Sequence, residues 1–325
     1  MSDRLVDRYD AVLFDLDGTV YRGSEAIPGA AEAVNAVRRA GRAVRFVTNN
    51  ASRAPGEVAE QLAGLGISVE VAEVRTSAQA AAAVLADKVP SGANVLVVGT
   101  EALADEVRGA GLAVVRQAGR DVAAVVQGLS RDVGWRELSE AVLAVRAGAF
   151  WVACNADATL PTERGEVIGN GALVAAVTAA TKASPVVAGK PNRPLMDQAA
   201  GGSARPLVVG DRLDTDIEGA VAAGLDALMV LSGVSTAAEL LDSGLRPRYV
   251  APDVTALAGN AEDVEIGQAP EWEIAGDRVR WVGTGSPDAL RLLRALCAAG
   301  INAPRPDDDT ARAALAGLGL GDRIA

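Results

Sequence analysis

Short apolar runs alternate with longer amphipathic stretches over most of the chain. Ala11–Phe14 is apolar throughout and is followed by acidic residues, as expected for a buried parallel strand. Residues 28–41 carry apolar side chains at helical spacing, and Gly41 is placed to end that helix. Residues 43–47 predict a second strand and residues 55–65 a second helix. This β-α-β-α order predicts an α/β fold with a doubly wound, Rossmann-like parallel sheet.

The same alternation continues to about residue 231. Further strands and helices are predicted at Asn94–Val98, 101–108, 122–126, Trp135–Arg146, Phe150–Ala153, up to about Thr181, near Val186, and at 206–209, 213–223 and 227–231. Residues 160–171 contain Pro and Gly, and we expect them to form a loop.

The last 65 residues follow a different pattern. Trp272–Ala275 and residues 278–282 alternate around Gly276 and Asp277, which predicts a hairpin, and residues 287–299 predict a helix. This part is therefore expected to be a small β-β-α appendage. The acidic residues 307–309 either cap a short final helix or form a solvated turn, the alternative that we favour, and we assign no metal to them.

Composition narrows the classes of function. Half of the 325 residues are apolar and 22% are charged, which fits a soluble protein with a sizeable core. The net charge of −11 argues against nucleic acid as a partner, because nucleic-acid binding needs a basic face. It leaves room for an anionic metabolite beside a metal ion. Since the chain has no histidine, any catalysis must run on carboxylates, hydroxyls, Lys or Arg.

The location of the protein is also constrained. The two cysteines form no CxxC pair, so neither a disulfide framework nor a zinc site is expected, and this suits a reducing compartment. The first ten residues lack the apolar segment of a signal peptide, and no apolar run is long enough to span a bilayer. We therefore expect a cytoplasmic protein with no membrane partner.

Two carboxylates follow the first predicted strand. Asp15 and Asp17 are two positions apart, so in an extended chain they point to the same side, at the strand end where open α/β sheets bind ligands. Carboxylates this close repel each other unless a cation lies between them, and Mg²⁺ prefers such oxygen ligands. Gly18 allows a tight turn after the pair. The alternative is an Asx-type turn at a strand end.

Other polar residues also follow predicted strands. Thr48 and Asn49 end the second strand, where a hydroxyl and an amide either bind phosphoryl oxygens or begin a helix. Lys190, one of only three lysines, is either held in a partly dry cleft or exposed at the surface. Asp211 ends a later strand and Asp216 lies five residues further on. The alternative for this segment is an acidic helix N-terminus, which explains Asp214 but not the whole arrangement.

Taken together and in this order, these segments resemble the haloacid dehalogenase superfamily of phosphohydrolases. The similarity is greatest to its subgroup with a large α/β (C2-type) cap, which includes glycerol 3-phosphate, phosphoglycolate and p-nitrophenyl phosphatases. The resemblance covers about residues 8–90 and 185–260. It implies a division into a core domain in two parts, an inserted cap and a C-terminal appendage, at residues 1–89, 185–260, 90–184 and 261–325 respectively.

The resemblance implies a role for each polar residue in the hydrolysis of a phosphate ester. Asp15 is the nucleophile that becomes phosphorylated. Asp17 protonates the leaving alcohol and later deprotonates the attacking water. Thr48 binds the phosphoryl group, Asn49 lines its site, and Lys190 neutralises charge there. Such chemistry needs mainly positioning and charge neutralisation, and it needs no histidine.

The resemblance also implies Mg²⁺ as the cofactor. The ion is expected to be held by the Asp15 side chain, the Asp17 backbone carbonyl and Asp211, with Asp216 supporting it from outside. Related ion-pumping ATPases have Thr at the position of Asp17. An acid/base at that position favours rapid hydrolysis, so the resemblance implies a phosphatase.

The expected substrate is a small phosphorylated metabolite. Asn155, Asp157 and Arg164 lie in the part that resembles the family's substrate-facing cap loop and are candidate contacts for the leaving group. The alternative is a structural loop whose side chains bond to the backbone. A cap phosphatase with a C-terminal appendage resembles glycerol 3-phosphate phosphatases, and this resemblance implies glycerol 3-phosphate as the leading substrate. 2-Phosphoglycolate and other small sugar or nucleotide phosphates come next. The missing histidine counts against pyridoxal phosphate.

Two other functions have to be weighed. An aspartyl-phosphate signalling module also uses Asp, Thr, Lys and Mg²⁺, but it phosphorylates an Asp after its third strand and has no inserted cap. A catalytically dead binding module is disfavoured because every required residue is present. The appendage could be an acetyltransferase-like fragment that supports a homodimer.

Overall fold

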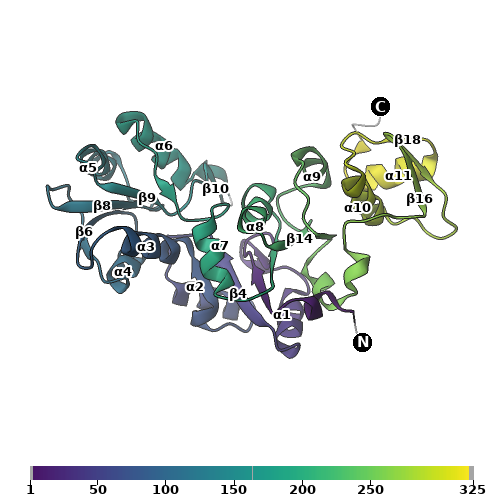
Figure 1. Ribbon diagram of the computed structural model, residues 1–325, viewed down its shortest axis with the longest axis horizontal. Helices are drawn as coiled ribbons and strands as arrows, with labels where there is room; N and C mark the ends of the chain where they lie inside the picture. The colour runs from purple at the N-terminus through teal and green to yellow at the C-terminus, as the bar shows by residue number, and fades with distance from the viewer. Residues whose placement is uncertain (1–2, 163, 322–325) are drawn as a thin grey trace. The chain divides into compact units, whose positions relative to one another are not determined.

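The computed structural model describes residues 3–162 and 164–321, and the chain forms two compact units (Figure 1). Unit 1 consists of Met1–Val44 and Gly202–Ala325, and unit 2 consists of Arg45–Gly201. The division after Val44 falls inside strand β4 (Ala43–Thr48), so the chain enters unit 2 through that strand.

Four parallel strands form the centre of unit 1, in the order β15-β14-β13-β1. Their bounds are Ala11–Phe14 for β1, Pro206–Gly210 for β13, Asp226–Val230 for β14 and Tyr249–Ala251 for β15. Every residue of β1 and β13 is buried. Strands that are covered on both faces need apolar side chains at each position, which explains the continuous apolar runs in the sequence.

Short elements surround these strands. They are η1 (Leu5–Arg8), β2 (Tyr21–Arg22), β3 (Glu25–Ala26), α1 (Ala30–Arg39), η3 (Leu213–Ile217), α8 (Glu218–Ala223), α9 (Ala237–Ser243), η4 (Val254–Ala258) and η5 (Ala261–Asp263). The predicted helix at 213–223 begins with a π-helical turn, η3, before it continues as α8. Such wide turns are rare in proteins and are frequent at functional sites.

The C-terminal part of unit 1 contains the predicted hairpin, β16 (Trp272–Ala275) and β17 (Arg278–Trp281), with Gly276 in its turn. A third strand, β18 (Arg305–Pro306), pairs in parallel with β17 and was not predicted, because two residues carry no periodic pattern. The appendage is therefore more than a β-β-α unit.

Two helices complete this part of the chain. Helix α10 (Ala289–Ala299) confirms the predicted helix, and its first turn is capped by Asp288. Helix α11 (Asp309–Gly317) begins after Asp308, whose carboxylate accepts a hydrogen bond from the N–H of Ala311 at 2.7 Å. The acidic residues thus cap a helix, and the favoured expectation of a solvated turn was wrong.

Unit 2 contains a five-stranded parallel sheet in the order β12-β9-β8-β6-β7, together with the pair β4–β5. The strand bounds are Val74–Thr76 for β5, Asn94–Val98 for β6, Ala113–Val115 for β7, Val122–Gln127 for β8, Phe150–Ala153 for β9 and Val186–Val187 for β12. The helices are α2 (Pro55–Gly64), η2 (Val71–Glu73), α3 (Ser77–Lys88), α4 (Glu101–Gly109), α5 (Trp135–Arg146), α6 (Asn170–Thr181) and α7 (Arg193–Ala200). Helices α5 and α6 cover one face of the five-stranded sheet, and α3 and α4 lie on the other (Figure 1).

The expected loop at 160–171 was wrong. It contains an antiparallel hairpin, β10 (Thr159–Thr162) and β11 (Gly165–Ile168), and α6 begins directly afterwards at Asn170. Gly165 has φ of 109°, a conformation that suits glycine in a tight hairpin turn. Prolines are tolerated in such a two-stranded ribbon because both strands are edges.

The parallel strands and intervening helices confirm the predicted α/β class, and most predicted elements end within two residues of the observed ones. The four-part domain division stays a prediction, since its boundaries differ from those of the two compact units. Among the helices of the described residues, none combines the length and the apolar character that crossing a bilayer requires.

Candidate functional site

Strand β1 places Asp15 and Asp17 at its carboxyl end in unit 1. The N–H of Asp15 donates to the carbonyl of Val209 at 2.8 Å, which extends the β1–β13 pairing by one residue. Gly18 follows with φ of 88°, and a Cβ atom there would overlap the carboxylate of Asp211. Glycine is therefore needed for the turn and for the close approach of that carboxylate.

Asp211, at the carboxyl end of strand β13, is fully buried, with 0% of its surface exposed. Its Oδ1 accepts a hydrogen bond from Thr19 Oγ1 at 3.2 Å, and its Oδ2 accepts one from the N–H of Val234 at 2.7 Å. Any Cβ at Gly233 would overlap the same carboxylate. The sequence analysis missed Thr19, Gly233 and Val234 as parts of the site. The available signal was their position in the loops that follow β1 and β14.

Three carboxylates of unit 1 converge. One oxygen atom from each of Asp15, Asp211 and Asp216 lies within 4.8 Å of the others. Asp211 and Asp216 are 0% and 1% exposed, so their mutual repulsion is poorly screened by water. A divalent cation removes this conflict, and an all-carboxylate donor set fits Mg²⁺. In the described part of the chain, the group does not include the side chain of Asp17.

Asp216 reaches this group from the π-helical turn η3. Its Oδ2 accepts a hydrogen bond from the N–H of Arg212 at 3.2 Å, and a Cβ at Gly210 would overlap its side chain. Asp214, on the same turn, is instead exposed and paired with Arg212 at 2.6 Å. The turn therefore directs Asp216 into the carboxylate cluster and Asp214 toward solvent. The alternative interpretation, an acidic residue at a helix N-terminus, suits Asp214. The predicted outer role of Asp216 stays a prediction.

Asp17 has different surroundings from the three clustered carboxylates. Its residue surface is exposed, yet enough protein surrounds the carboxyl group that desolvation raises its pKa above the usual value. Hydrogen bonding to the backbone of Gly23 and the charges of Arg22 and Arg212 oppose this rise in pKa. A carboxyl group that retains its proton more readily than usual suits a general acid.

Thr48 ends strand β4 in unit 2, opposite Thr76 of β5. The side chain is nearly buried, and its Oγ1 accepts a hydrogen bond from the N–H of Asn50 at 3.1 Å. The next helix, α2, begins only at Pro55, so the alternative of a helix N-cap at Thr48 was wrong. Its hydroxyl hydrogen is free to be donated to another group.

Asn49 connects two segments of unit 2. Its Oδ1 accepts a hydrogen bond from the N–H of Lys190 at 2.8 Å, and its Nδ2 donates to the carbonyl of Lys190 at 3.1 Å. The same Nδ2 donates to the carboxylate of Asp157 at 3.2 Å. A Cβ at Gly189 would overlap the amide. These contacts hold the main chain of Lys190, and they use both donors and the acceptor of the Asn49 side chain.

Lys190 is only 4% exposed, so the alternative of a solvated surface lysine was wrong. Its Nζ donates to the carbonyl oxygen of Val47 at 3.3 Å, next to Thr48 along the chain. A buried ammonium keeps its charge when anionic or carbonyl oxygens surround it. The structure therefore places the Lys190 ammonium group beside the end of strand β4, and its role at the phosphoryl group stays a prediction.

The candidate substrate contacts differ from one another. Asn155 is buried, and its Nδ2 donates to the carbonyl of Asn49 at 2.7 Å, which favours the structural alternative for this residue. Asp157 is partly buried beside the amide of Asn49. Arg164 is exposed in the turn between β10 and β11. The loop is closely packed at its base, since a Cβ at Gly169 or at Gly171 would overlap its backbone.

Comparisons with known proteins agree with this geometry. Residues 12–113 match the model of the haloacid dehalogenase-like hydrolases, and residues 187–257 match a second model, described as HAD-hydrolase-like. The chain is 48% identical to the D-glycerol 3-phosphate phosphatase of Mycobacterium tuberculosis over 295 residues, which cover 89% of this chain and 83% of that protein. It is 36% identical to an acid sugar phosphatase of Staphylococcus saprophyticus, with coverage of 78% and 98%.

A solved structure is similar over almost the whole chain. The glycerol phosphate phosphatase of Mycobacterium tuberculosis in complex with magnesium superposes with a TM-score of 0.92 at 45% identity. The match covers 98% of this chain and 100% of that one, so the similarity includes the C-terminal segment.

Proposed function

The chain belongs to the haloacid dehalogenase-like hydrolases, and from this premise we propose that it hydrolyses glycerol 3-phosphate to glycerol and inorganic phosphate in a Mg²⁺-dependent reaction. The reaction passes through an aspartyl-phosphate on Asp15. The enzyme class follows from the family, and the substrate is supported by the 48% identity to a phosphatase named for it.

The observation that carries the proposal is the cluster of three carboxylates in unit 1. Asp15, Asp211 and Asp216 bring three like charges within 4.8 Å of one another, while the Asp17 side chain stays outside this group. Mg²⁺ would be held by the side chains of Asp15 and Asp211 and by the Asp17 backbone carbonyl. When bound, the ion neutralises charge on the nucleophile and on the phosphoryl oxygens.

In the first step, a carboxylate oxygen of Asp15 attacks the phosphorus atom. An acyl-phosphate bond forms as the ester P–O bond breaks, and the electron pair goes to the leaving oxygen. Asp17 donates its proton to that oxygen, so that the alcohol leaves as a neutral molecule. In the second step, Asp17 accepts a proton from water as the water oxygen attacks phosphorus. Inorganic phosphate is released and the Asp15 carboxylate is restored.

The polar residues of unit 2 supply charge and hydrogen bonds to the phosphoryl group. Lys190 neutralises the developing negative charge, and Thr48 donates its hydroxyl hydrogen to a phosphoryl oxygen. Asn49 holds the main chain of Lys190, which is supported by its two hydrogen bonds to that residue. We propose Asp157 and Arg164 as contacts of the leaving group, and Asn155 as support for their loop.

Other small substrates follow the leading one. Sugar phosphates are favoured next, because an acid sugar phosphatase is 36% identical to the chain. 2-Phosphoglycolate remains an alternative with a leaving group of similar size. We also propose that residues 90–184 act as the cap and that the enzyme works in the cytoplasm, as a homodimer if the C-terminal segment self-associates.

A substrate panel with one nucleophile variant tests the proposal. Initial rates with Mg²⁺ are measured for glycerol 3-phosphate, 2-phosphoglycolate, a sugar phosphate, a nucleoside monophosphate and p-nitrophenyl phosphate. Glycerol 3-phosphate should give the highest kcat/KM. Asp15→Asn should lose roughly 10³-fold or more in kcat on every substrate, whereas the control Asp214→Asn should stay near wild type. Hydrolysis of p-nitrophenyl phosphate by Asp15→Asn at the wild-type rate would overturn the mechanism.

A further inference from the structure

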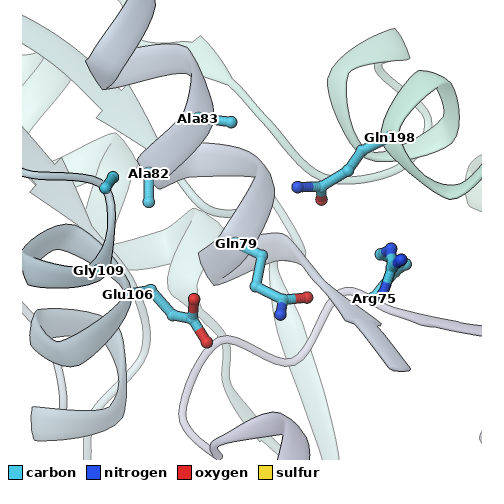
Figure 2. Close-up of a pocket in the computed structure, with 8 residues that line it drawn as sticks. Arg75, Gln79, Ala82, Ala83, Glu106, Gly109 and Gln198 are labelled. Carbon is cyan, nitrogen blue, oxygen red and sulfur yellow. The ribbon is translucent and has the colours of Figure 1, made fainter. Parts of the chain in front are cut away.

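A cavity of about 440 Å³, open to solvent on one side, lies in unit 2 and is lined by helices α3, α4 and α7 and by strand β5 (Figure 2). Its size falls in the range of small-molecule sites. Four of its lining residues are small, either Ala or Gly, and four are polar: Arg75, Gln79, Glu106 and Gln198. None of the polar four has a role in the proposed hydrolysis.

Arg75 is a half-buried cation without an anionic partner. Its Nη1 donates to the carbonyl oxygens of Ala72 and Val74 at 2.6 and 2.9 Å. Across residues 3–162 and 164–321, no carboxylate forms an ion pair with it. Burial, and then the nearby charge of Arg45, lower its pKa, so its charged state is incompletely compensated. An anion in the cavity would supply the missing charge.

Glu106 is the matching half-buried anion, on helix α4. The neighbouring cation Arg108 is already bound to Glu101 and Asp105, and no ion pair reaches Glu106 from any described Arg or Lys. Burial is the main cause that raises its pKa, and Asp105 adds to the rise. A cation in the cavity would stabilise the charged form of this carboxylate.

Two amides complete the polar lining. Gln79 lies between Glu106 and Arg75 in Figure 2, and its Oε1 accepts a hydrogen bond from the N–H of Thr76 at 3.1 Å. Its Nε2 therefore remains a donor. The Oε1 of Gln198 is buried and has no hydrogen-bond partner among residues 3–162 and 164–321, although buried acceptors are nearly always paired. Figure 2 shows the Gln198 amide turned toward the same space.

We propose that this cavity binds a free α-amino acid. The carboxylate of the ligand pairs with Arg75 and the donor of Gln79, and its ammonium group pairs with Glu106. Arg75 and Glu106 line one cavity without forming an ion pair with each other, so a ligand that carries both charges can pair with both residues. A ligand with only a negative charge would be repelled by Glu106, and a ligand with only a positive charge would be repelled by Arg75. The small Ala and Gly residues leave room for a compact side chain.

The proposal is tested by direct binding, which does not depend on the phosphatase reaction. The twenty protein amino acids are screened against the full chain by saturation-transfer NMR, and each binder is compared with its N-acetyl and carboxamide derivatives. At least one amino acid should bind, and the derivatives that lack one charge should not. Absence of binding by all twenty, or equal binding by a derivative, would overturn the proposal.

Two variants locate the site. Arg75→Gln and Glu106→Gln should each weaken binding about tenfold or more, because each leaves one ligand charge unpaired. The controls Arg193→Gln and Glu60→Gln change exposed residues of the same unit outside the cavity and should bind like wild type. Circular dichroism verifies that each variant is folded. Unchanged affinity in both folded cavity variants would contradict the proposed site, and the derivative comparison decides the matter if either variant fails to fold.

Discussion

The polar residues of the two units are organised in opposite ways. In unit 1, Asp15, Asp211 and Asp216 bring like charges together, two of them fully buried. In unit 2, Asn49 and Lys190 are joined by hydrogen bonds between an amide and a main chain. The first arrangement stores repulsion that a cation can relieve, whereas the second satisfies its own polar groups. The carboxylate cluster of unit 1 thus concentrates like charges, whereas the Asn49–Lys190 support of unit 2 pairs its polar groups by hydrogen bonds.

The largest effect is expected from Asp17→Asn, which changes a residue next to the carboxylate cluster of unit 1. Turnover should fall by about 10³-fold, because the amide can neither donate the proton to the leaving alcohol nor accept one from water. Mg²⁺ affinity should change much less, since the proposed ligand is the backbone carbonyl. Steady-state kinetics and calorimetric Mg²⁺ titration measure the two quantities. Equal losses in both would count against the assigned role.

Asp211→Asn tests the repulsion inside unit 1 directly. Activity should fall by roughly 100-fold, and the stabilisation of wild type by Mg²⁺, about 2.7 kcal/mol at 100 times Kd, should largely disappear. In EDTA the variant should be at least as stable as wild type, because one buried like charge is gone. Thermal melts with and without Mg²⁺ provide the measurement. A variant that is much less stable than wild type in EDTA would show that the group is self-compensated.

Asn49→Ala tests the support in unit 2. The loss of two hydrogen bonds to Lys190 should lower kcat by roughly tenfold to a hundredfold, because a displaced cation stabilises the transition state poorly. Mg²⁺ binding should stay unchanged. Asn50→Ala is the matched control, since among the described residues that exposed side chain bonds only to Ser52. If both variants lose the same activity, the support is not specific to Asn49.

Gln127→Met gives the smallest expected effect, a change in the free energy of unfolding. Gln127 of unit 2 is 0% exposed, and unlike Asn49, within the described part of the chain both polar atoms of its side chain lack hydrogen-bond partners. An apolar side chain of similar shape should therefore raise the free energy of unfolding by about 1 kcal/mol. Denaturant titration measures this change. A decrease in stability would mean that the amide is satisfied in solution.

The alternation of apolar strands and amphipathic helices made the α/β class predictable, because burial on both faces forces continuous apolar runs such as Ala11–Phe14. Asp15, Asp17 and Asp211 were predictable for a related reason, since they follow such runs, and Asp216 lies five residues after Asp211. Helix α3 (Ser77–Lys88) was missed because its many alanines give little contrast between its faces. The short strands β5 and β18 were too brief for any period to show.

What the sequence could not supply is the identity of contacts between distant segments. Asn49 was expected to line the phosphoryl site, but its partnership with Lys190 depends on residues 141 positions apart in sequence. The hydrogen bonds from Thr19 and Val234 to Asp211 likewise join segments that are distant in the sequence. Arg75 and Glu106 carry no motif at all. They line one cavity only because the fold packs both β5, which carries Arg75, and α4, which carries Glu106, against α3.

The central claim is that Asp15 becomes phosphorylated. Wild-type enzyme turning over p-nitrophenyl phosphate with Mg²⁺ is quenched in acid and treated with borohydride, which reduces an acyl phosphate of aspartate to homoserine. Peptide mass spectrometry then locates the reduced residue. The account predicts homoserine at position 15 and none at position 17 or 211. Reduction at another aspartate, or unmodified Asp15 despite rapid turnover and efficient trapping of a control acyl phosphate, would contradict it.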